Sequence, residues 1–250
     1  MRRFRKPLLF ALVCLPAAVI GGYFMLRYQL ELLPPETIGQ LTEQAGSRAA
    51  LIAVGLVQTA AAVLPAAFFG RILAEKLGLW RPLRFEKKQL QTTVLLSVPA
   101  GILFSADYWT FGAVFPEIQE AAEAGMTAWG VLASVFYGGV IEELLMRLFA
   151  MSLTGFILWK LFGRKKEKVP AAALITANIL ASLLFAAGHL PAAIVLFGSL
   201  TPLLVFRCFL LNGGFGLLFG RLYRKYGIQY AMAGHALCHI VSKLIWRIAL

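Results

Sequence analysis

The segment TAWGVLASVFYGGVIEELLMRLFAMSLTGFILWKLF, Thr127 to Phe162, is 36 residues long and contains only four charged side chains. About 20 apolar residues are enough to cross a bilayer as an α-helix. As one straight helix the segment would run roughly 54 Å, well beyond a hydrocarbon core of about 30 Å. It therefore predicts one membrane-spanning element whose excess length is absorbed by tilt, a break or protrusion from the bilayer.

Further apolar blocks of spanning length lie on either side of this segment. They are Pro7 to Tyr28, Ala49 to Leu73, Leu90 to Trp109, Pro170 to Gly188, Pro202 to Tyr226 and Ile228 to Ile248. Of the 250 residues, 60% are apolar and 14% charged, which leaves too little polar surface to coat a soluble globule. The sequence predicts an all-α, polytopic transmembrane helical bundle of seven spans. An eighth is counted if the short apolar segment Leu190 to Leu200 forms a re-entrant or interfacial helix.

The formal net charge of +12 is concentrated at the ends of these blocks. The basic residues form four groups, namely Arg2, Arg3, Arg5 and Lys6; Arg71, Lys76, Arg81, Arg84, Lys87 and Lys88; Arg164, Lys165, Lys166 and Lys168; and Arg221, Arg224 and Lys225. The acidic residues predicted on the opposite side are Glu31, Glu36, Glu43, Asp107, Glu117, Glu120 and Glu123. The positive-inside rule and anionic lipid headgroups account for this pattern. We therefore predict a multi-pass cell-membrane protein with a cytoplasmic N-terminus and no nucleic-acid partner.

The N-terminal block and the cysteines receive structural interpretations. Met1 to Gly22 has the layout of a cleavable signal peptide, but its apolar run continues to Leu26, which favours an uncleaved first span. Cys14, Cys208 and Cys238 each lie inside an apolar block without paired spacing, so we interpret them as small buried side chains.

A short set of ionisable residues lies inside the apolar blocks. It consists of Glu142, Glu143, Arg147, His189, Arg207, His235 and His239, and it includes every histidine of the chain. An ionisable side chain costs several kcal/mol at the bilayer centre, so each one is a functional hypothesis. Histidines together with carboxylates are typical of hydrolytic sites, where they act as acids and bases.

Helix geometry separates the two glutamates. Glu143 and Arg147 are four residues apart with the acid first, an arrangement that favours an ion pair along one helix face. Glu142 lies 100° around the helix and has no partner within it, which makes it the candidate general base.

The same four-residue spacing recurs around the histidines. His235 and His239 share one helix face, and Phe185 and His189 share another, where the phenyl ring would hold the imidazole in orientation.

Structural roles compete with these functional ones. For Glu143 and Arg147 we favour a structural ion pair over a catalytic role. For Phe185 taken alone we favour packing in the core. A single histidine can equally be a packed helix contact, and Arg207 is better explained as a partner of a lipid headgroup or a carboxylate. The coincidence of all three histidines with an unpaired glutamate in the C-terminal half favours function.

These residues resemble the motifs of the CPBP intramembrane proteases, a family named for CAAX proteases and bacteriocin-processing enzymes. It is also called the Abi family and includes type II CAAX prenyl endopeptidases. Its motifs are EExxxR, FxxxH and HxxxN or HxxxD. Here the first runs from Glu142 to Arg147, the second from Phe185 to His189, and the third begins at His235. The resemblance covers roughly residues 129–243, and three motifs in order within membrane helices are fairly specific.

By this resemblance, Glu142 activates water with assistance from His189. His235 and the residue four positions on bind the developing oxyanion. That last residue is Asn or Asp in the family and His239 here, and an imidazole can still donate a hydrogen bond. The resemblance implies an intramembrane endopeptidase acting on a membrane-associated peptide or protein. It also implies a catalytic core at 127–250, preceded by N-terminal transmembrane helices at 1–126 in a single membrane domain.

Two alternatives concern mechanism and class. His189, His235 and His239 with a glutamate are also the ligand types of a catalytic zinc site. We favour the glutamate mechanism without a metal or other cofactor, since the chain lacks an HExxH motif. His239 also keeps open a catalytically silent scaffold or bacteriocin-immunity-type protein on the same fold. A transporter ranks lower, because the sequence shows no inverted repeat.

Overall fold

The computed structural model describes residues 2–162 and 168–250, and only helices and their connections occur in them. The predicted all-α fold is confirmed. Arg164, Lys165 and Lys166 of the third basic group lie outside the described residues, and so do the side chains of Arg2 and Arg3.

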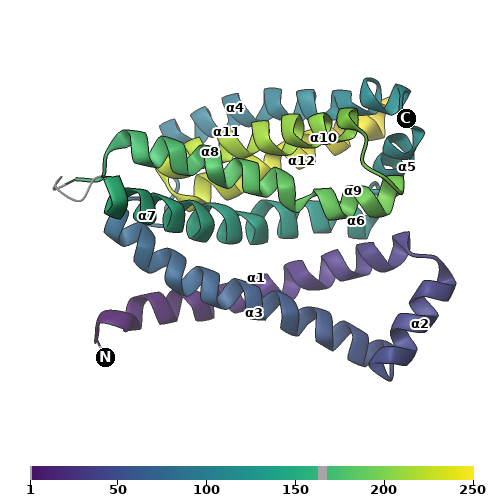
Figure 1. Ribbon diagram of the computed structural model, residues 1–250, viewed down its shortest axis with the longest axis horizontal. Helices are drawn as coiled ribbons and strands as arrows, with labels where there is room; N and C mark the ends of the chain where they lie inside the picture. Colours follow the sequence, from purple (N-terminus) through teal and green to yellow (C-terminus); the bar gives the residue numbers. More distant parts are fainter. Residues whose placement is uncertain (1, 163–167) are drawn as a thin grey trace.

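Helices follow one another throughout the described residues (Figure 1). The first part comprises α1 (Arg2–Leu32), α2 (Pro35–Ala45), α3 (Arg48–Leu77), α4 (Lys87–Ser105), η1 (Ala106–Tyr108), η2 (Phe111–Ala113) and α5 (Pro116–Ala124). The long central segment comprises α6 (Ala128–Ala133), η3 (Ser134–Glu142), η4 (Leu144–Met151) and α7 (Ser152–Phe162). The last part comprises α8 (Ala171–Gly188), α9 (Leu190–Phe197), α10 (Pro202–Cys208), η5 (Phe209–Gly213), α11 (Gly214–Tyr226) and α12 (Ile228–Ala249).

Among the described residues, six helical segments are long and apolar enough to cross a membrane, against the seven or eight predicted. The difference has two causes. The predicted last span, α12, has the length but carries His235, His239, Lys243 and Arg247, which lower its hydropathy. The predicted eighth element is α9, which continues α8 as part of one candidate span, Ala171–Phe197.

The central segment runs unbroken from Ala128 to Phe162 as one candidate span. Thr127 begins it by accepting a hydrogen bond from the Gly130 amide at 3.1 Å. Its middle, η3 and η4, is π-helical, with more residues in each turn than an α-helix. This winding shortens a segment that would be too long as a straight α-helix. π-Turns are rare overall but are frequent at functional sites; here η3 ends at Glu142 and η4 contains Arg147, with Glu143 between the two elements.

Glycines bring the central segment and α4 close to α12. A Cβ added at Gly139 would lie 2.8 Å from the Cβ of Ala236, and one added at Gly101 would lie 2.7 Å from the carbonyl oxygen of Cys238. Neither position has room for a side chain. Backbones therefore meet at the level where α12 carries His235 and His239, which places these histidines against η3.

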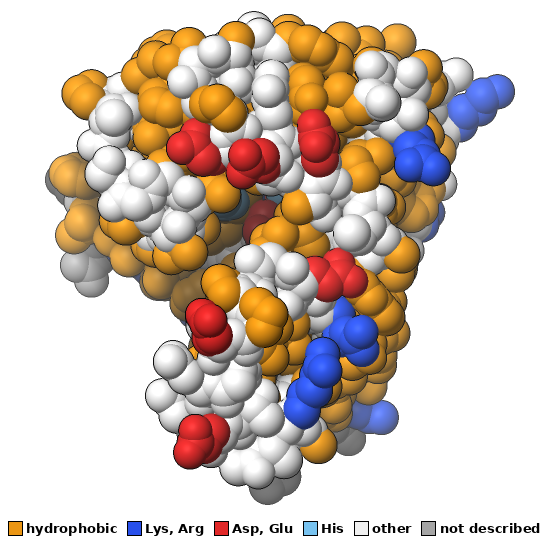
Figure 2. Space-filling view, turned by 90° about the vertical axis from the view of Figure 1, so that its right-hand side faces the viewer, with side chains coloured by type: hydrophobic (Ala, Val, Ile, Leu, Met, Phe, Trp, Pro, Cys, Tyr) orange, Lys and Arg blue, Asp and Glu red, His pale blue; other side chains and the backbone are white. Residues whose placement is uncertain are grey.

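The remaining helices enclose this contact. α1 and α3 pack on each other and cover η3 and η4, while α8 packs against η4, α7 and α11. The start of α1 and the end of α7 lie at one end of the molecule, and α2 and α5 lie at the other (Figure 1). Figure 2 views the second end and shows a hollow with acidic side chains around it and a histidine visible in its depth.

Candidate active site

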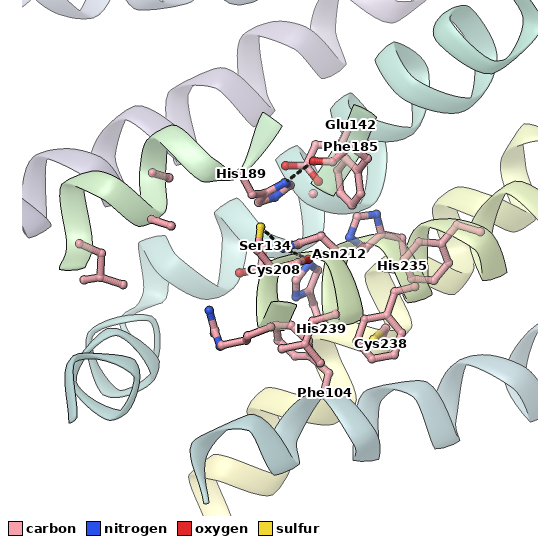
Figure 3. Close-up of a pocket in the computed structure, with 18 of the residues that line it drawn as sticks. Phe104, Ser134, Glu142, Phe185, His189, Cys208, Asn212, His235, Cys238 and His239 are labelled. Atoms are coloured by element: carbon pink, nitrogen blue, oxygen red, sulfur yellow. Dashed lines mark hydrogen bonds between the residues drawn. The ribbon is translucent and has the colours of Figure 1, made fainter. Parts of the chain in front are cut away.

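The four residues predicted as catalytic line one cavity of about 330 Å³. Glu142 comes from the end of η3, His189 from the junction of α8 and α9, and His235 and His239 from α12. Phe185, predicted as a supporting residue, lines it as well. In Figure 3 these side chains surround one space, although they come from three segments separated by dozens of residues. The fold therefore brings the predicted set together.

Behind the cavity wall, Glu143 and Arg147 form the predicted ion pair. Arg147 Nη1 lies 3.2 Å from Glu143 Oε1, and the two side chains are 2% and 0% exposed. The guanidinium also lies over the Phe185 ring, 4.6 Å from its centroid. A charge so completely buried requires a partner, and each member of the pair provides one for the other.

His235 joins this pair, which the sequence did not indicate. Its Nδ1 lies 2.8 Å from Glu143 Oε1. A carboxylate can only accept, so Nδ1 carries the proton and donates it. In the neutral ring Nε2 is then the unprotonated nitrogen. Glu143 therefore sets the tautomer of His235 besides pairing with Arg147.

His189 is held in a similar way by a different group. Its Nδ1 donates to the carbonyl oxygen of Phe185 at 2.8 Å, one helical turn earlier. The Phe185 ring meets the imidazole edge-on, with centroids 4.6 Å apart, and it also contacts the His235 ring at 6.2 Å. The predicted orienting contact of Phe185 is present, and the Nε2 of His189 is left as an acceptor.

The rings of His235 and His239 form a stack. Their centroids are 4.9 Å apart, and Phe219 stacks on the other face of His235 at 4.4 Å. Phe104 meets His239 edge-on at 5.6 Å. The aromatic neighbours restrict both imidazoles to one orientation, a role for Phe104 and Phe219 that no spacing in the sequence indicated.

Gly138 faces the histidine stack from η3. A Cβ added there would lie 3.0 Å from His239 Nε2 and 3.7 Å from His235 Nε2. Both Nε2 atoms are therefore directed at the part of η3 that precedes Glu142 by one turn. Sequence reasoning missed Gly138; the adjacent pair Gly138 and Gly139 within an apolar span was its only signal.

Glu142 differs from the other site residues because no described residue bonds to it. Its side chain is half-buried at the cavity wall and has no hydrogen-bond or ion-pair partner within the described parts of the chain. A carboxylate in this setting can accept a proton from a water molecule in the cavity. The arrangement thus places the Glu142 carboxylate and the imidazole Nε2 atoms around one small, largely apolar cavity.

Arg207 has the carboxylate partner that we expected as one of its two roles. Its Nε donates to Asp107 Oδ1 at 2.8 Å, and its Nη2 donates to Asp107 Oδ2. Asp107 is 4% exposed, although the sequence placed it with the acidic residues on one side of the membrane. Asn212 and Ser134, also unpredicted, add polar groups to the cavity wall.

The zinc alternative finds no matching geometry. Within residues 2–162 and 168–250, no three His, Cys, Asp or Glu side chains form a group able to hold a metal ion. We therefore derive no step through a metal.

Residues 124–241 match the family model of type II CAAX prenyl endopeptidase Rce1-like proteins. This part of the chain is an Rce1-like CAAX protease domain. The match confirms the family expected from the motifs. The Rce1-like domain begins at the end of α5 and extends into α12. It therefore contains η3, η4 and α8, together with the cavity residues that these elements contribute. No curated protein and no solved structure matches the chain. The chain is thus a multi-pass membrane protein with an intramembrane protease domain.

Proposed function

We propose that this protein is an intramembrane endopeptidase that hydrolyses a peptide bond in a membrane-associated protein or peptide, with Glu142 as the general base. One observation carries the proposal: Glu142, the site carboxylate that has no partner among the described residues, faces the same cavity as all three histidines. General bases need this access to water, whereas structural carboxylates are engaged by the protein.

The first step is the activation of water. A water molecule donates one hydrogen bond to Glu142 and one to the acceptor Nε2 of His189. Glu142 takes a proton as the oxygen attacks the peptide carbonyl carbon, and the carbonyl electron pair moves onto oxygen. The tetrahedral intermediate then collapses, the C–N bond breaks, and the protonated Glu142 gives its proton to the leaving amine.

His239 and His235 are proposed to stabilise the oxyanion. His239 has no described hydrogen bond to Nδ1, so its Nε2 is free to carry the proton and donate it. His235 donates from Nε2 when it is protonated, and Glu143 beside its Nδ1 stabilises that imidazolium. Phe185, Glu143 and Arg147 act as positioning residues, and no cofactor is required.

For the membrane, we propose the cell membrane with the N-terminus in the cytoplasm. Basic residues of α1, of the α3–α4 connection and of the end of α11 support it, because positive-inside asymmetry favours a cytoplasmic location for such groups.

The decisive experiment replaces Glu142 by Gln in the purified full-length chain. We expect kcat on fluorogenic peptides that the wild type cleaves to fall about a hundredfold to ten-thousandfold. Thermal unfolding stays unchanged, because Glu142 bonds to no described residue. Glu120→Gln, on the exposed face of α5, is the matched control and keeps wild-type rates. Retention of activity by Glu142→Gln would remove the proposed base.

Metal analysis of the same preparation tests the mechanism separately. We expect substoichiometric zinc and no loss of cleavage after treatment with a chelator. Stoichiometric zinc whose removal abolishes cleavage, with recovery on addition of the metal, would replace the glutamate mechanism by a metal-assisted one.

A catalytically silent scaffold or immunity-type protein is the second candidate, and His239 in place of Asn or Asp favours it. A proteomic comparison of cells carrying wild type or His189→Ala distinguishes the two. Protein fragments that disappear with the variant support the endopeptidase, and identical fragment sets support the scaffold.

A further inference from the structure

A second cavity, of about 190 Å³, adjoins the catalytic one. The two share Phe104, Ser134, Leu196, Arg207 and His239 in their walls. The second cavity extends from His239 towards α5 and the end of α12. The second cavity is therefore the neighbouring space into which a peptide bound at the catalytic residues could extend past these shared side chains.

Lys243 lines this second cavity and is buried, with 8% of it exposed. Its Nζ donates to the carbonyl oxygen of Gly125 at 2.6 Å, and the Trp246 ring lies 6.0 Å away. No described carboxylate lies within ion-pair distance of it. A buried cation that has only a neutral acceptor lacks the compensation that such groups usually have.

The other charges of this cavity do not compensate Lys243. Arg207 and Asp107 bind each other in a two-point ion pair, so their charges cancel. Lys243 is left as the uncompensated charge among the described residues that line the space. The cavity is therefore suited to an anionic group small enough to reach Nζ.

The position of Lys243 relates it to the reacting bond. His235, His239 and Lys243 follow one another at intervals of four residues on one face of α12. Lys243 is thus about 6 Å along the axis from His239 and about 12 Å from His235. An extended peptide covers about 3.3–3.6 Å per residue, so this distance corresponds to roughly two to four residues.

We propose that Lys243 binds a carboxylate of the substrate, two to four residues from the bond that is cut. The proposal rests on the proposed endopeptidase function and adds a specificity-determining residue to it. A free C-terminus and an Asp or Glu side chain share this chemistry. Both would accept hydrogen bonds from Nζ, and the buried setting strengthens a charge-assisted bond.

The competing role of Lys243 is structural. Gly125 follows the last residue of α5, and a cation near the C-terminal end of a helix is favourable without any ligand. A test must therefore measure selectivity between substrates, since loss of stability alone would follow from either role.

The test uses matched peptides derived from one that the wild type cleaves. One pair differs in a free C-terminus against a C-terminal amide, and the other in Glu against Gln at positions two to four residues from the cut. We expect kcat/KM to favour one carboxylate member at least about tenfold. In Lys243→Met this ratio falls to near one, while Lys243→Arg keeps most of it. The pair that shows the effect identifies the source of the carboxylate.

A ratio that stays the same in Lys243→Met, or a wild type that cleaves both members of each pair equally, overturns the proposal while leaving the endopeptidase function intact. Binding of the same labelled peptides to Glu142→Gln provides an arm that needs no turnover. If no peptide is cleaved, tighter binding of the carboxylate peptides to Glu142→Gln still supports the subsite, provided that this preference disappears in the double variant Glu142→Gln, Lys243→Met. Equal binding of acid and amide peptides rejects it.

Discussion

Glu142 and Glu143 are neighbours in the chain but belong to different regions of the molecule. Glu143 is fully buried and binds both Arg147 and His235, whereas Glu142 lies at the cavity wall and has no partner in the part of the chain that the structure describes. The rotation from one residue to the next around the helix axis is enough to separate them. One short motif therefore contributes to two regions. Glu143, Arg147 and His235 form a closed layer, which is buried and orients the imidazole, and Glu142 belongs to an open layer, which faces the cavity and can react with water.

The largest expected effect is a difference in unfolding stability between variants of the two glutamates. Glu143→Gln leaves Arg147 buried without an anion, and breaking a buried pair in this way costs about 3–5 kcal/mol. Glu142→Gln should change stability by less than about 0.5 kcal/mol. Thermal or denaturant unfolding in detergent measures both. Adding Arg147→Met to Glu143→Gln should recover part of the loss, because it removes the unpaired charge. Equal stability of the two single variants would show that the layers do not differ.

Substitutions at His239 test the open layer, where this residue faces the cavity together with Glu142. His239→Ala removes a proposed oxyanion donor and should lower kcat about a hundredfold to a thousandfold. His239→Asn restores a side-chain donor and should remain within about tenfold of the wild type. Steady-state kinetics on one peptide compare the three proteins. If Asn and Ala reduce kcat equally, the hydrogen-bond donor at this position is not what matters.

A substitution at Gly138 tests how closely η3 must pack against the histidines of α12. In Gly138→Ala the new methyl group would lie 3.0 Å from His239 Nε2, so the imidazole must move. We expect kcat/KM to fall about tenfold to a hundredfold, because small displacements of catalytic groups are costly. Gly39→Ala in α2, where an added Cβ meets nothing within 4 Å, is the matched control. A Gly138→Ala protein within twofold of wild type would mean that the stack tolerates displacement.

The smallest effect concerns a neutral contact in the closed layer. Ser152 Oγ and Tyr223 Oη are 2.7 Å apart in the buried core. Ser152→Ala should lower the free energy of unfolding by about 1 kcal/mol and leave kcat unchanged. Ser199→Ala, at an exposed position, provides the comparison. A loss as large as that of Glu143→Gln would contradict the view that buried charge dominates this layer.

Local spacing predicted the contacts that lie within one helix. The Glu143–Arg147 pair and the Phe185–His189 contact are separated by four residues, a distance that helix geometry translates directly into proximity. The free state of Glu142 within its own helix followed from the same rule. These parts of the candidate site were therefore accessible from sequence.

Contacts between helices were not accessible in this way. His235 meets Glu143 across 92 residues, and Arg207 meets Asp107 across 100, so only the packed bundle brings them together. The π-turns of η3 and η4 also have no reliable composition signal, and they decide which side chains of the central segment face the cavity. The span counts differ at α12, which is predicted as a span from the sequence but is not among the six candidate spans, because polar residues of the candidate site lower its hydropathy.

The hollow in Figure 2 is at the end of the molecule that carries α2 and α5, away from the N-terminus. With the cytoplasmic N-terminus proposed above, this hollow would open on the far side of the bilayer. A peptidase site reached through it would then meet polypeptides on that side of the membrane, during or after export.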